Sequence, residues 1–280
     1  MIMTLGAAAR RRARWLAWRW LTWHQPGRNL RVTLPGGGLF DQPLRSAIGR
    51  LMMTEGFEVA ELAFMRGVLR PGDTMIDVGA NAGLHCVVAG CAVGPRGRVI
   101  AFEPIVREQG LLRHNLALNS LENVSIVPSA VSDKTGSARF AMAEDGALSS
   151  LAQNKHPWQR ISAWQEVPVT TLDAYVAREH TGPVAFLKID VEGAEKLVLA
   201  GASRLLADNP GITVLFEALD VTTAGFGYST HAFLRSLQTQ GYALSYLDAK
   251  GALAPVRQMR REYGTHIYNF VLRHPARPDA

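Results

Sequence analysis

Short apolar runs alternate along most of the chain with longer segments in which apolar side chains recur at helical spacing. The runs are bounded by glycine, proline and polar residues, which is typical of strands buried in a parallel sheet. The expected strands are 74–78, 98–102, 124–127, 138–141, 166–170, 184–189, 212–216, 242–247 and 266–272. The expected helices are 55–69, 81–91, 104–118, 194–206 and 230–240.

This alternation predicts an α/β domain with a mainly parallel sheet and helices on both of its faces. The last two strands are joined by a segment without helical periodicity, so they are expected to form an antiparallel pair at one edge. The chain has 280 residues, enough for one such domain with extensions but too few for two full-sized enzymatic domains. We expect an N-terminal extension over 1–54, the α/β domain over 55–273 and a C-terminal tail over 274–280.

Two polar stretches interrupt the pattern. Residues 144–165 have little periodicity and are expected to form an active-site loop or lid. Together with residues 219–229 they are expected to shape the pocket of a substrate, although neither stretch contains a motif that identifies one. Trp158 and Trp164 are candidates to stack on a sugar or to cover the site.

The basic charge is concentrated at the N-terminus. The formal net charge is +6, and the remainder of the chain is close to charge balance, so the charge does not indicate a nucleic acid as a substrate. Charged residues also interrupt every apolar run before it reaches the length of about 18 residues that a transmembrane helix needs. The N-terminal cluster consists of Arg10, Arg11, Arg12, Arg14, Arg19, Trp15, Trp18, Trp20 and Trp23.

This N-terminal segment, residues 1–28, is expected to form a helix. Its arginines and aromatic side chains suit a peripheral contact with a membrane surface or with another protein. The alternative is a helix that buries its tryptophans against the core or against a second subunit. A secretory signal is not expected, because arginine and tryptophan break the apolar region that such a signal needs.

Cys86 and Cys91 are the two cysteines, and both fall within one expected helix. Their spacing suits neither a metal site nor a disulfide framework, so both are expected to be small, buried apolar side chains. A reduced, cytoplasmic protein fits this usage best, with residues 1–28 as the candidate contact with the inner face of a membrane.

The most informative segment is 77–83, with the sequence DVGANAG, at the junction of an expected strand and helix. Glycines there let the backbone approach a ligand, and the beginning of the helix is expected to offer unpaired amide donors. Glu103 ends the next strand, 103 − 83 = 20 residues after the last glycine. In Rossmann-type sites, a carboxylate so placed binds the ribose hydroxyls of an adenosine cofactor.

The spacing of the glycines argues against a dinucleotide as that cofactor. Residues 79–83 have the pattern G-x-x-x-G rather than G-x-G-x-x-G, and the acidic Asp77 precedes them. An acidic side chain beside the turn attracts an amino group and repels a pyrophosphate.

Five separated motifs resemble, in order and spacing, those of the FkbM family of class I methyltransferases. They are TMIDVGANAG at 74–83, FEP at 102–104, SAVSD at 129–133, TTLD at 170–173 and LKIDVEGAE at 187–195. The resemblance covers about residues 55–248 and implies a Rossmann-like fold with a mainly parallel, seven-stranded sheet. It also implies S-adenosyl-L-methionine as the cofactor and O-methylation of a sugar, a polyketide or a related hydroxyl compound.

The resemblance further implies a cofactor site. The turn at 77–83 would surround the methionine end, Glu103 would bind the ribose and residues 129–132 would line the adenine. Glu58 would reach the cofactor from the preceding helix, or would be an ordinary solvated or capping glutamate. The residues expected at the cofactor are Glu58, Asp77, Gly79, Ala80, Asn81, Gly83, Glu103, Pro104, Ser129, Ala130, Val131, Ser132 and Asp190.

The catalytic candidates lie at the carboxyl ends of the later strands, the edge where open α/β sheets bind ligands. Methyl transfer to a hydroxyl needs a positioned acceptor oxygen and a group that removes its proton. Asp190 and Glu192 are the first candidates for this base, and Lys188 lies on the same side of its strand as Asp190. Glu217 and His231 are the further candidates at this edge.

Several alternatives remain open at this point. Asp190, Glu192 and Glu217 could hold Mg²⁺, but spacing does not decide this and no metal site is assigned. The other functions to weigh are methylation of nitrogen or of a macromolecule, and S-adenosylmethionine binding without catalysis. Residues 190–193 do not have the Asn-Pro-Pro-Tyr type sequence usual in N-methylating enzymes, and intact acidic motifs favour an enzyme. The expected partner is a small-molecule or sugar acceptor rather than a nucleic acid, and a homo-oligomer is left open.

Overall fold

The computed structural model describes residues 7–144, 148–152 and 159–274. The strands are β1 (Asn29–Thr33), β2 (Leu39–Pro43), β3 (Thr74–Val78), β4 (Arg98–Phe102), β5 (Val124–Val127), β6 (Ala130–Val131), β7 (Gly136–Ala143), β8 (Ile161–Thr170), β9 (Phe186–Ile189), β10 (Thr213–Glu217), β11 (Ala243–Leu247), β12 (Leu253–Pro255) and β13 (Asn269–Arg273). The helices are α1 (Ala7–His24), α2 (Ala47–Thr54), α3 (Val59–Val68), α4 (Leu84–Val93), α5 (Val106–Leu118), α6 (Leu172–Glu179), α7 (Glu195–Ala200), α8 (Ser203–Asp208), α9 (Asp220–Thr223), the 3₁₀ turn η1 (Ala224–Phe226) and α10 (Thr230–Thr239).

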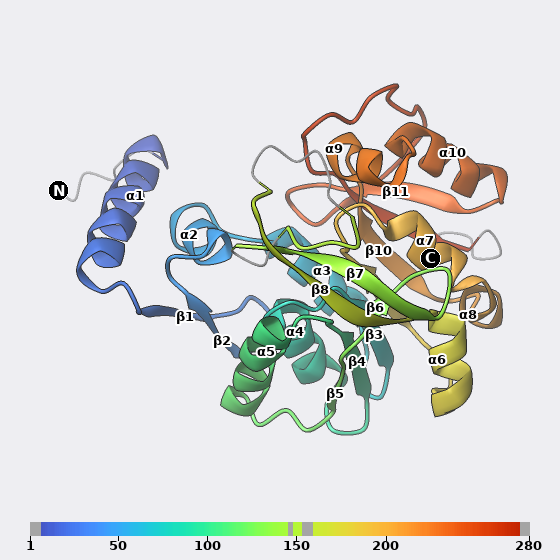
Figure 1. The fold of residues 1–280 in the computed structure, drawn as a ribbon, viewed down its shortest axis with the longest axis horizontal. Helices are drawn as coiled ribbons and strands as arrows, with labels where there is room; N and C mark the ends of the chain where they lie inside the picture. Colours follow the sequence, from blue (N-terminus) through green and yellow to red (C-terminus); the bar gives the residue numbers. More distant parts are fainter. Residues whose placement is uncertain (1–6, 145–147, 153–158, 275–280) are drawn as a thin grey trace.

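The main sheet has eight strands in the order β5-β4-β3-β9-β10-β13-β11-β12 (Figure 1). The strands from β5 to β10 run parallel, and β13 inserts antiparallel between β10 and β11. The seven strands from β5 to β11 are the sheet that the sequence predicts, including its antiparallel edge. The short strand β12 extends this sheet by one.

Alternating side chains of the central strands supply one apolar core on each face of the sheet. Ile76 of β3 and Ile100 of β4 belong to the core formed with α6, α7, α8 and α10. Their neighbours Met75 and Val99 belong to the core formed with α3, α4 and α5. Helix α4 is buried on nearly all sides, which explains why its sequence is apolar around its whole circumference.

The strand order reverses between β3 and β9, and this reversal fixes where a ligand can bind. From β3 the chain continues to β4 on one side, whereas β9 pairs with β3 on the other side. Open α/β sheets bind their ligands in the crevice at the carboxyl ends of two such strands. The backbones of the two strand ends approach each other closely at this point. A Cβ atom added to Gly79 would lie only 1.9 Å from the carbonyl oxygen of Asp190.

Two expected helices differ from the prediction because side chains and backbone conformation interrupt them. The helix expected from residue 81 begins at Leu84, since Asn81 and Gly83 both have positive φ angles. The helix expected over 194–206 is divided into α7 and α8. The carboxylate of Asp173 accepts hydrogen bonds from the amides of Arg204 (3.0 Å) and Leu205 (2.8 Å) and so stabilises a second helix start.

The polar stretch 144–165 is shorter as a loop than expected, because β8 begins at Ile161. β8 pairs antiparallel with β7 and parallel with β6, which makes a second, three-stranded sheet. Residues 145–147 and 153–158, with Trp158, lie outside the described residues, as do residues 275–280 of the expected tail.

The N-terminal extension, residues 1–54, contains two parts that pack differently. The β1–β2 hairpin docks on α5, where the side-chain amide of Asn115 bonds to both the N–H and the carbonyl of Asp41 (2.8 and 3.1 Å). α1 instead stands apart from the sheet (Figure 1). Its Trp18 donates a hydrogen bond to the carbonyl of Leu44 (2.8 Å), which ties the helix to the chain just before α2. None of the helices that the structure describes is long and apolar enough to cross a membrane.

The two cysteines have different environments. Cys86 is fully buried, as expected, and its thiol donates to Asp77 (3.2 Å). Cys91 is exposed, so the expectation that it is buried is wrong. Both lie on α4, but Cys91 falls on the part of the helix that faces solvent.

Replacement of Gly79 tests the close contact between the ends of β3 and β9. Gly79→Ala is expected to lower the free energy of unfolding by about 2 kcal/mol or more, because it adds a collision with the Asp190 carbonyl to the strain of a positive φ. Gly72→Ala is the matched control, because Gly72 has φ +92° with nothing within 4 Å of its Cβ position. It should lose about 1 kcal/mol. Equal losses in urea unfolding would show that the contact is not tight.

Candidate active site

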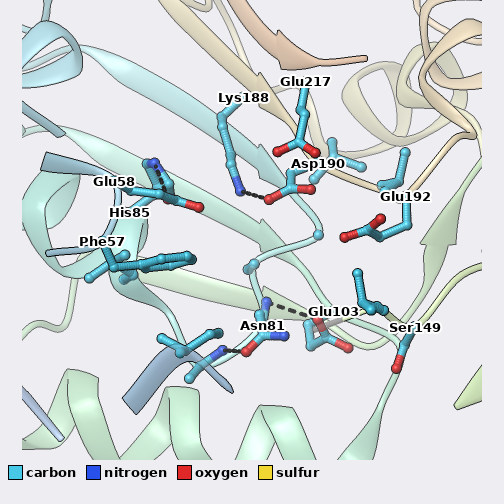
Figure 2. Close-up of a pocket in the computed structure, with 18 of the residues that line it drawn as sticks. Phe57, Glu58, Asn81, His85, Glu103, Ser149, Lys188, Asp190, Glu192 and Glu217 are labelled. Atoms are coloured by element: carbon cyan, nitrogen blue, oxygen red, sulfur yellow. Dashed lines mark hydrogen bonds and ion pairs between the residues drawn. The ribbon is translucent and has the colours of Figure 1, made fainter. Parts of the chain in front are cut away.

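A cavity of about 790 Å³ opens at the carboxyl ends of β3 and β9, where the strand order reverses. Figure 2 shows two groups of polar side chains that face it from different elements. Asn81 and Glu103 lie at one end, after β3 and β4. Asp190, Glu192 and Glu217 lie at the other end, after β9 and β10.

The glycine-rich turn after β3 is held by its own hydrogen bonds rather than left with open donors. The amides of Gly79 and Ala80 both donate to the carbonyl of Phe102 (3.0 Å each), and those of Asn81, Ala82 and Gly83 also have partners within the protein. The unpaired amides are expected at the beginning of the helix, which is α4 from Leu84, and its N-cap Gly83 makes no side-chain capping hydrogen bond. A turn without free amides is poorly suited to a pyrophosphate, which agrees with the missing dinucleotide pattern.

Glu103 is buried at 4% exposure and is fixed by two backbone amides. Oε2 accepts from Asn81 N (2.9 Å) and Oε1 accepts from Ile105 N (2.8 Å). Each oxygen keeps one further lone pair for a ligand. Burial raises the pKa of Glu103 to about 7, although the two amides work in the opposite direction.

Lys188 is a buried cation on β9 between two aspartates. Its Nζ lies 3.2 Å from Oδ2 of Asp190 and 3.8 Å from Oδ1 of Asp77. Although burial alone would lower the pKa of Lys188, the surrounding carboxylates raise it above its ordinary value. Asp77 is fully buried beneath the turn and does not line the cavity, whereas Lys188 and Asp190 do.

Glu192 and Glu217 bring two more carboxyl groups to the Asp190 end of the cavity. Burial raises the pKa of both well above the usual range, and the charge of Glu217 raises that of Glu192 further. Asp190 acts on both in the same direction. A positive charge that approaches these two groups lowers their pKa values again.

Glu58, the residue just before α3, lines the cavity. It adopts a left-handed conformation (φ 51°), and its Oε2 lies 3.1 Å from Nε2 of His85. Burial raises the pKa of Glu58 to about 8 and lowers that of His85 well below 6.5. His85 is therefore neutral, and its contact with Glu58 pairs two neutral groups near pH 7.

Of the residues expected at the adenine, Ser129, Ala130 and Val131 line the cavity next to Pro104. Ser132 does not line it, because its hydroxyl turns to Asp133 (3.1 Å). Phe140 of β7 adds an aromatic wall that the sequence did not indicate.

His231 is not part of the site. Its Nδ1 bonds to the carbonyl of Arg260 (2.7 Å), and its side chain is absent from the lining that the described residues form. Trp164 also lies elsewhere, with the guanidinium of Arg139 5.0 Å from its ring. Among the described residues, 219–229 contribute nothing to the lining, so the expectation that they shape the pocket is wrong.

The loop after β7 does reach the cavity. Leu148, Ser149 and Leu151 line it. The hydroxyl of Ser150 donates to the carbonyls of Val191 (3.2 Å) and Glu192 (3.0 Å), which fixes the loop to the end of β9.

Sequence reasoning missed the wall that α2 and the residues around it provide. These residues lie before the recognised motifs, and no motif marks them. It also missed a pair below the acidic group, in which Asn269 donates to Glu61. The pairing of Glu217 with Asn269 across β10 and β13 brings this pair to the site. The unanticipated lining residues are Arg11, Phe40, Ala47, Ile48, Arg50, Leu51, Glu55, Gly56, Phe57, Glu61, His85, Ile267 and Asn269.

The acidic side chains do not converge as metal ligands. Within residues 7–144, 148–152 and 159–274, no group of three or more histidine, cysteine, aspartate or glutamate side chains has the geometry to hold a metal ion.

Comparison with known proteins gives a family and one clear relative. Residues 77–244 match the family model described as the methyltransferase FkbM domain. The 31-O-demethyl-FK506 methyltransferase FkbM of Streptomyces tacrolimicus is 31% identical over 187 residues, which cover 56% of this chain and 69% of that protein.

The solved structures that match this chain are more distant in sequence. A putative rRNA methylase of Clostridium thermocellum has a TM-score of 0.47 at 13% identity and covers 76% of this chain and 92% of its own. A SAM-dependent O-methyltransferase of Thermotoga maritima has a TM-score of 0.44 at 16% identity and covers 91% and 96%. The family model and the relative in Streptomyces together show that this chain belongs to the FkbM family of S-adenosylmethionine-dependent methyltransferases.

Proposed function

We propose that this methyltransferase acts on oxygen and methylates a hydroxyl of a small molecule, a sugar or a natural product. The observation that carries the proposal is the half-buried acidic group at the ends of β9 and β10. Asp190, Glu192 and Glu217 face the same cavity as the cofactor candidates, and a hydroxyl needs a nearby proton acceptor to become a good nucleophile.

The cavity fits S-adenosylmethionine. The two open lone pairs of Glu103 match the two hydroxyls of a ribose, and Ser129, Ala130 and Val131 offer a wall for an adenine. At the other end, the carboxyl groups of Asp190 and Glu58 suit the cationic methionine portion. When bound, the cofactor supplies an electrophilic methyl group on a positively charged sulfur.

In this proposal, some acidic residues accept the proton of the acceptor hydroxyl and others position the reacting groups. Glu192 and Glu217 are the better proton acceptors, because their raised pKa values give them greater basicity than an ordinary carboxylate. Asp190 is held by Lys188 at 3.2 Å and positions the acceptor oxygen or the sulfonium. Asp77 supports Lys188 from below and takes no direct part.

The acceptor is expected to carry an apolar portion beside its hydroxyl. Ile48, Leu51 and Phe57 form an apolar wall on the α2 side of the cavity. The proposed cofactor contacts do not involve this wall, so it can face the acceptor. The relative in Streptomyces is named for a substrate, 31-O-demethyl-FK506, that is methylated on oxygen. This name supports oxygen as the acceptor atom and leaves the acceptor of this chain to experiment.

Methyl transfer with a ¹³C-labelled cofactor tests the acceptor atom. The purified protein, given S-adenosylmethionine with a labelled methyl group and a panel of hydroxylated macrolides and glycosides, should produce a methyl ether identified by its ¹³C chemical shift. The same acceptors with the hydroxyl already methylated are the control and should give no product. A label found on nitrogen or carbon would overturn the proposal.

The ribose assignment predicts a pH-dependent affinity for S-adenosylhomocysteine. Glu103 has a pKa of about 7 in the free protein, and ribose hydroxyls stabilise its ionised form. Binding should therefore release a proton below that pH and become up to about tenfold weaker at about pH 6 than at about pH 8. Calorimetry in buffers of different ionisation enthalpy measures both effects.

Glu103→Gln separates this group from the other carboxyls of the cavity. The variant should bind about 1–3 kcal/mol more weakly at about pH 8 and lose the part of the pH dependence that Glu103 causes. Glu108→Gln is the matched control, since Glu108 is equally buried but pairs with Arg107 outside the cavity. A folded Glu103→Gln protein with unchanged affinity would remove the ribose assignment.

Substitution at the acidic group tests its catalytic role. Asp190→Asn and Glu217→Gln should each lower kcat by about 10²-fold or more, with a smaller change in cofactor affinity. Asp208→Asn, at an exposed position on α8, should leave both unchanged. A chelator should not inhibit the wild-type protein, and inhibition reversed by Mg²⁺ would point to a metal-assisted reaction instead.

A further inference from the structure

Helix α1 leaves an apolar face open to solvent. Trp23 is 81% exposed, Trp20 57% and Leu16 54%, which is unusual for large apolar side chains in a folded protein. Trp18 is the half-buried tryptophan of this helix, and it donates a hydrogen bond to the carbonyl of Leu44, just before α2. The helix is therefore not held in place by burying its tryptophans in the core.

The exposed residues form a continuous stripe. Ala9, Ala13, Leu16, Trp20 and Trp23 follow one another in alternate steps of four and three residues, which places them on one side of a helix. All five are exposed in the structure. Trp18 and Thr22 lie on the opposite side and attach the helix to the body through Leu44 and Arg45.

Arginines border this stripe on both sides. At 100° per residue, Arg12 and Arg19 fall along one edge, and Arg10 and Arg14 fall beyond the other. All four are exposed, and Arg19 lies 4.9 Å from the ring of Trp15. An apolar strip between two cationic borders is the pattern of a helix that lies flat in the headgroup region of a bilayer.

The charge of the segment is all of one sign. Residues 1–28 contain six arginines and no aspartate or glutamate, so the rest of the chain has 30 − 6 = 24 basic and 24 acidic residues. The whole net charge of +6 therefore lies on this segment. A second copy of α1 would bring like charges together, whereas an anionic lipid surface is complementary to them.

We infer that α1 binds the surface of a membrane that contains anionic lipids. The stripe of Ala9, Ala13, Leu16, Trp20 and Trp23 enters the interface, where indole rings are favoured, and the bordering arginines contact phosphate groups. The helix thereby holds the methyltransferase domain at the bilayer. Arg11, on the side of the same helix opposite the stripe, lines the cavity and pairs with Glu55 (2.8 Å), so α1 itself lies next to the active site.

Co-sedimentation of the full-length protein with vesicles tests the inference. Vesicles of phosphatidylcholine with phosphatidylglycerol should retain the protein, and vesicles of phosphatidylcholine alone should retain much less. Binding should fall as salt is raised, because the arginine contribution is screened. Tryptophan fluorescence should shift to the blue on binding, as indoles leave water.

Paired variants distinguish specific binding through the stripe and its arginine borders from nonspecific adsorption to vesicles. Trp20→Ala with Trp23→Ala should reduce binding at least tenfold, and Trp164→Ala, which removes a 42% exposed tryptophan from β8, should not. The double variant Arg12→Glu with Arg19→Glu should weaken vesicle binding by at least about fivefold for each positive charge that is removed. The control Arg235→Glu, on α10, should have little effect on vesicle binding. Affinity for S-adenosylhomocysteine and the melting temperature should stay unchanged in all four proteins.

Four outcomes would overturn the inference. The first is that the full-length protein fails to bind anionic vesicles. The second is that it binds them equally well after the Trp20 and Trp23 substitutions. Alternatively, it sediments as a dimer that these substitutions dissociate, which would make the stripe an interface between copies. Retention on an RNA or DNA probe without retention on vesicles would instead identify a nucleic acid as the partner.

Discussion

A single buried cation organises the active site of this methyltransferase. Lys188 lies on β9 between Asp77 and Asp190, and its charge is balanced by those two carboxylates. Removal of a buried charge from such a group leaves its partners uncompensated at a cost of several kcal/mol. Lys188 therefore allows the carboxyl ends of β3 and β9 to carry acids without an interior of unpaired negative charge.

More carboxyl groups surround the cavity than one lysine can neutralise, and burial shifts several of them toward their protonated form. Burial raises the pKa of Glu58 to about 8 and raises those of Glu192 and Glu217 well above their usual range. A cation bound beside these groups lowers the same pKa values. In the proposed function, binding of a positively charged cofactor would therefore change the basicity of these carboxyl groups.

The cavity is completed by chain segments outside the recognised motifs. The hairpin of β1 and β2 is locked to α5 by Asn115, and this places α2 as a wall opposite the acidic group. On another side, Ser150 ties the loop after β7 to the end of β9. The cavity is therefore lined both by the motifs and by neighbouring segments without motifs.

The sequence by itself determined the sheet, its antiparallel edge and the positions of Glu103 and Asp190, because periodicity and strand ends are local properties of the chain. It misplaced His231, since the direction of that side chain depends on Arg260, which is distant in sequence. It also misplaced Ser132, whose hydroxyl turns to the neighbouring Asp133. Only the tertiary structure decided that Asn269 and the residues of α2 reach the cavity and that the tryptophans of α1 point mainly to solvent. These features come from contacts between segments far apart in the chain, which leave no periodic signal in either segment.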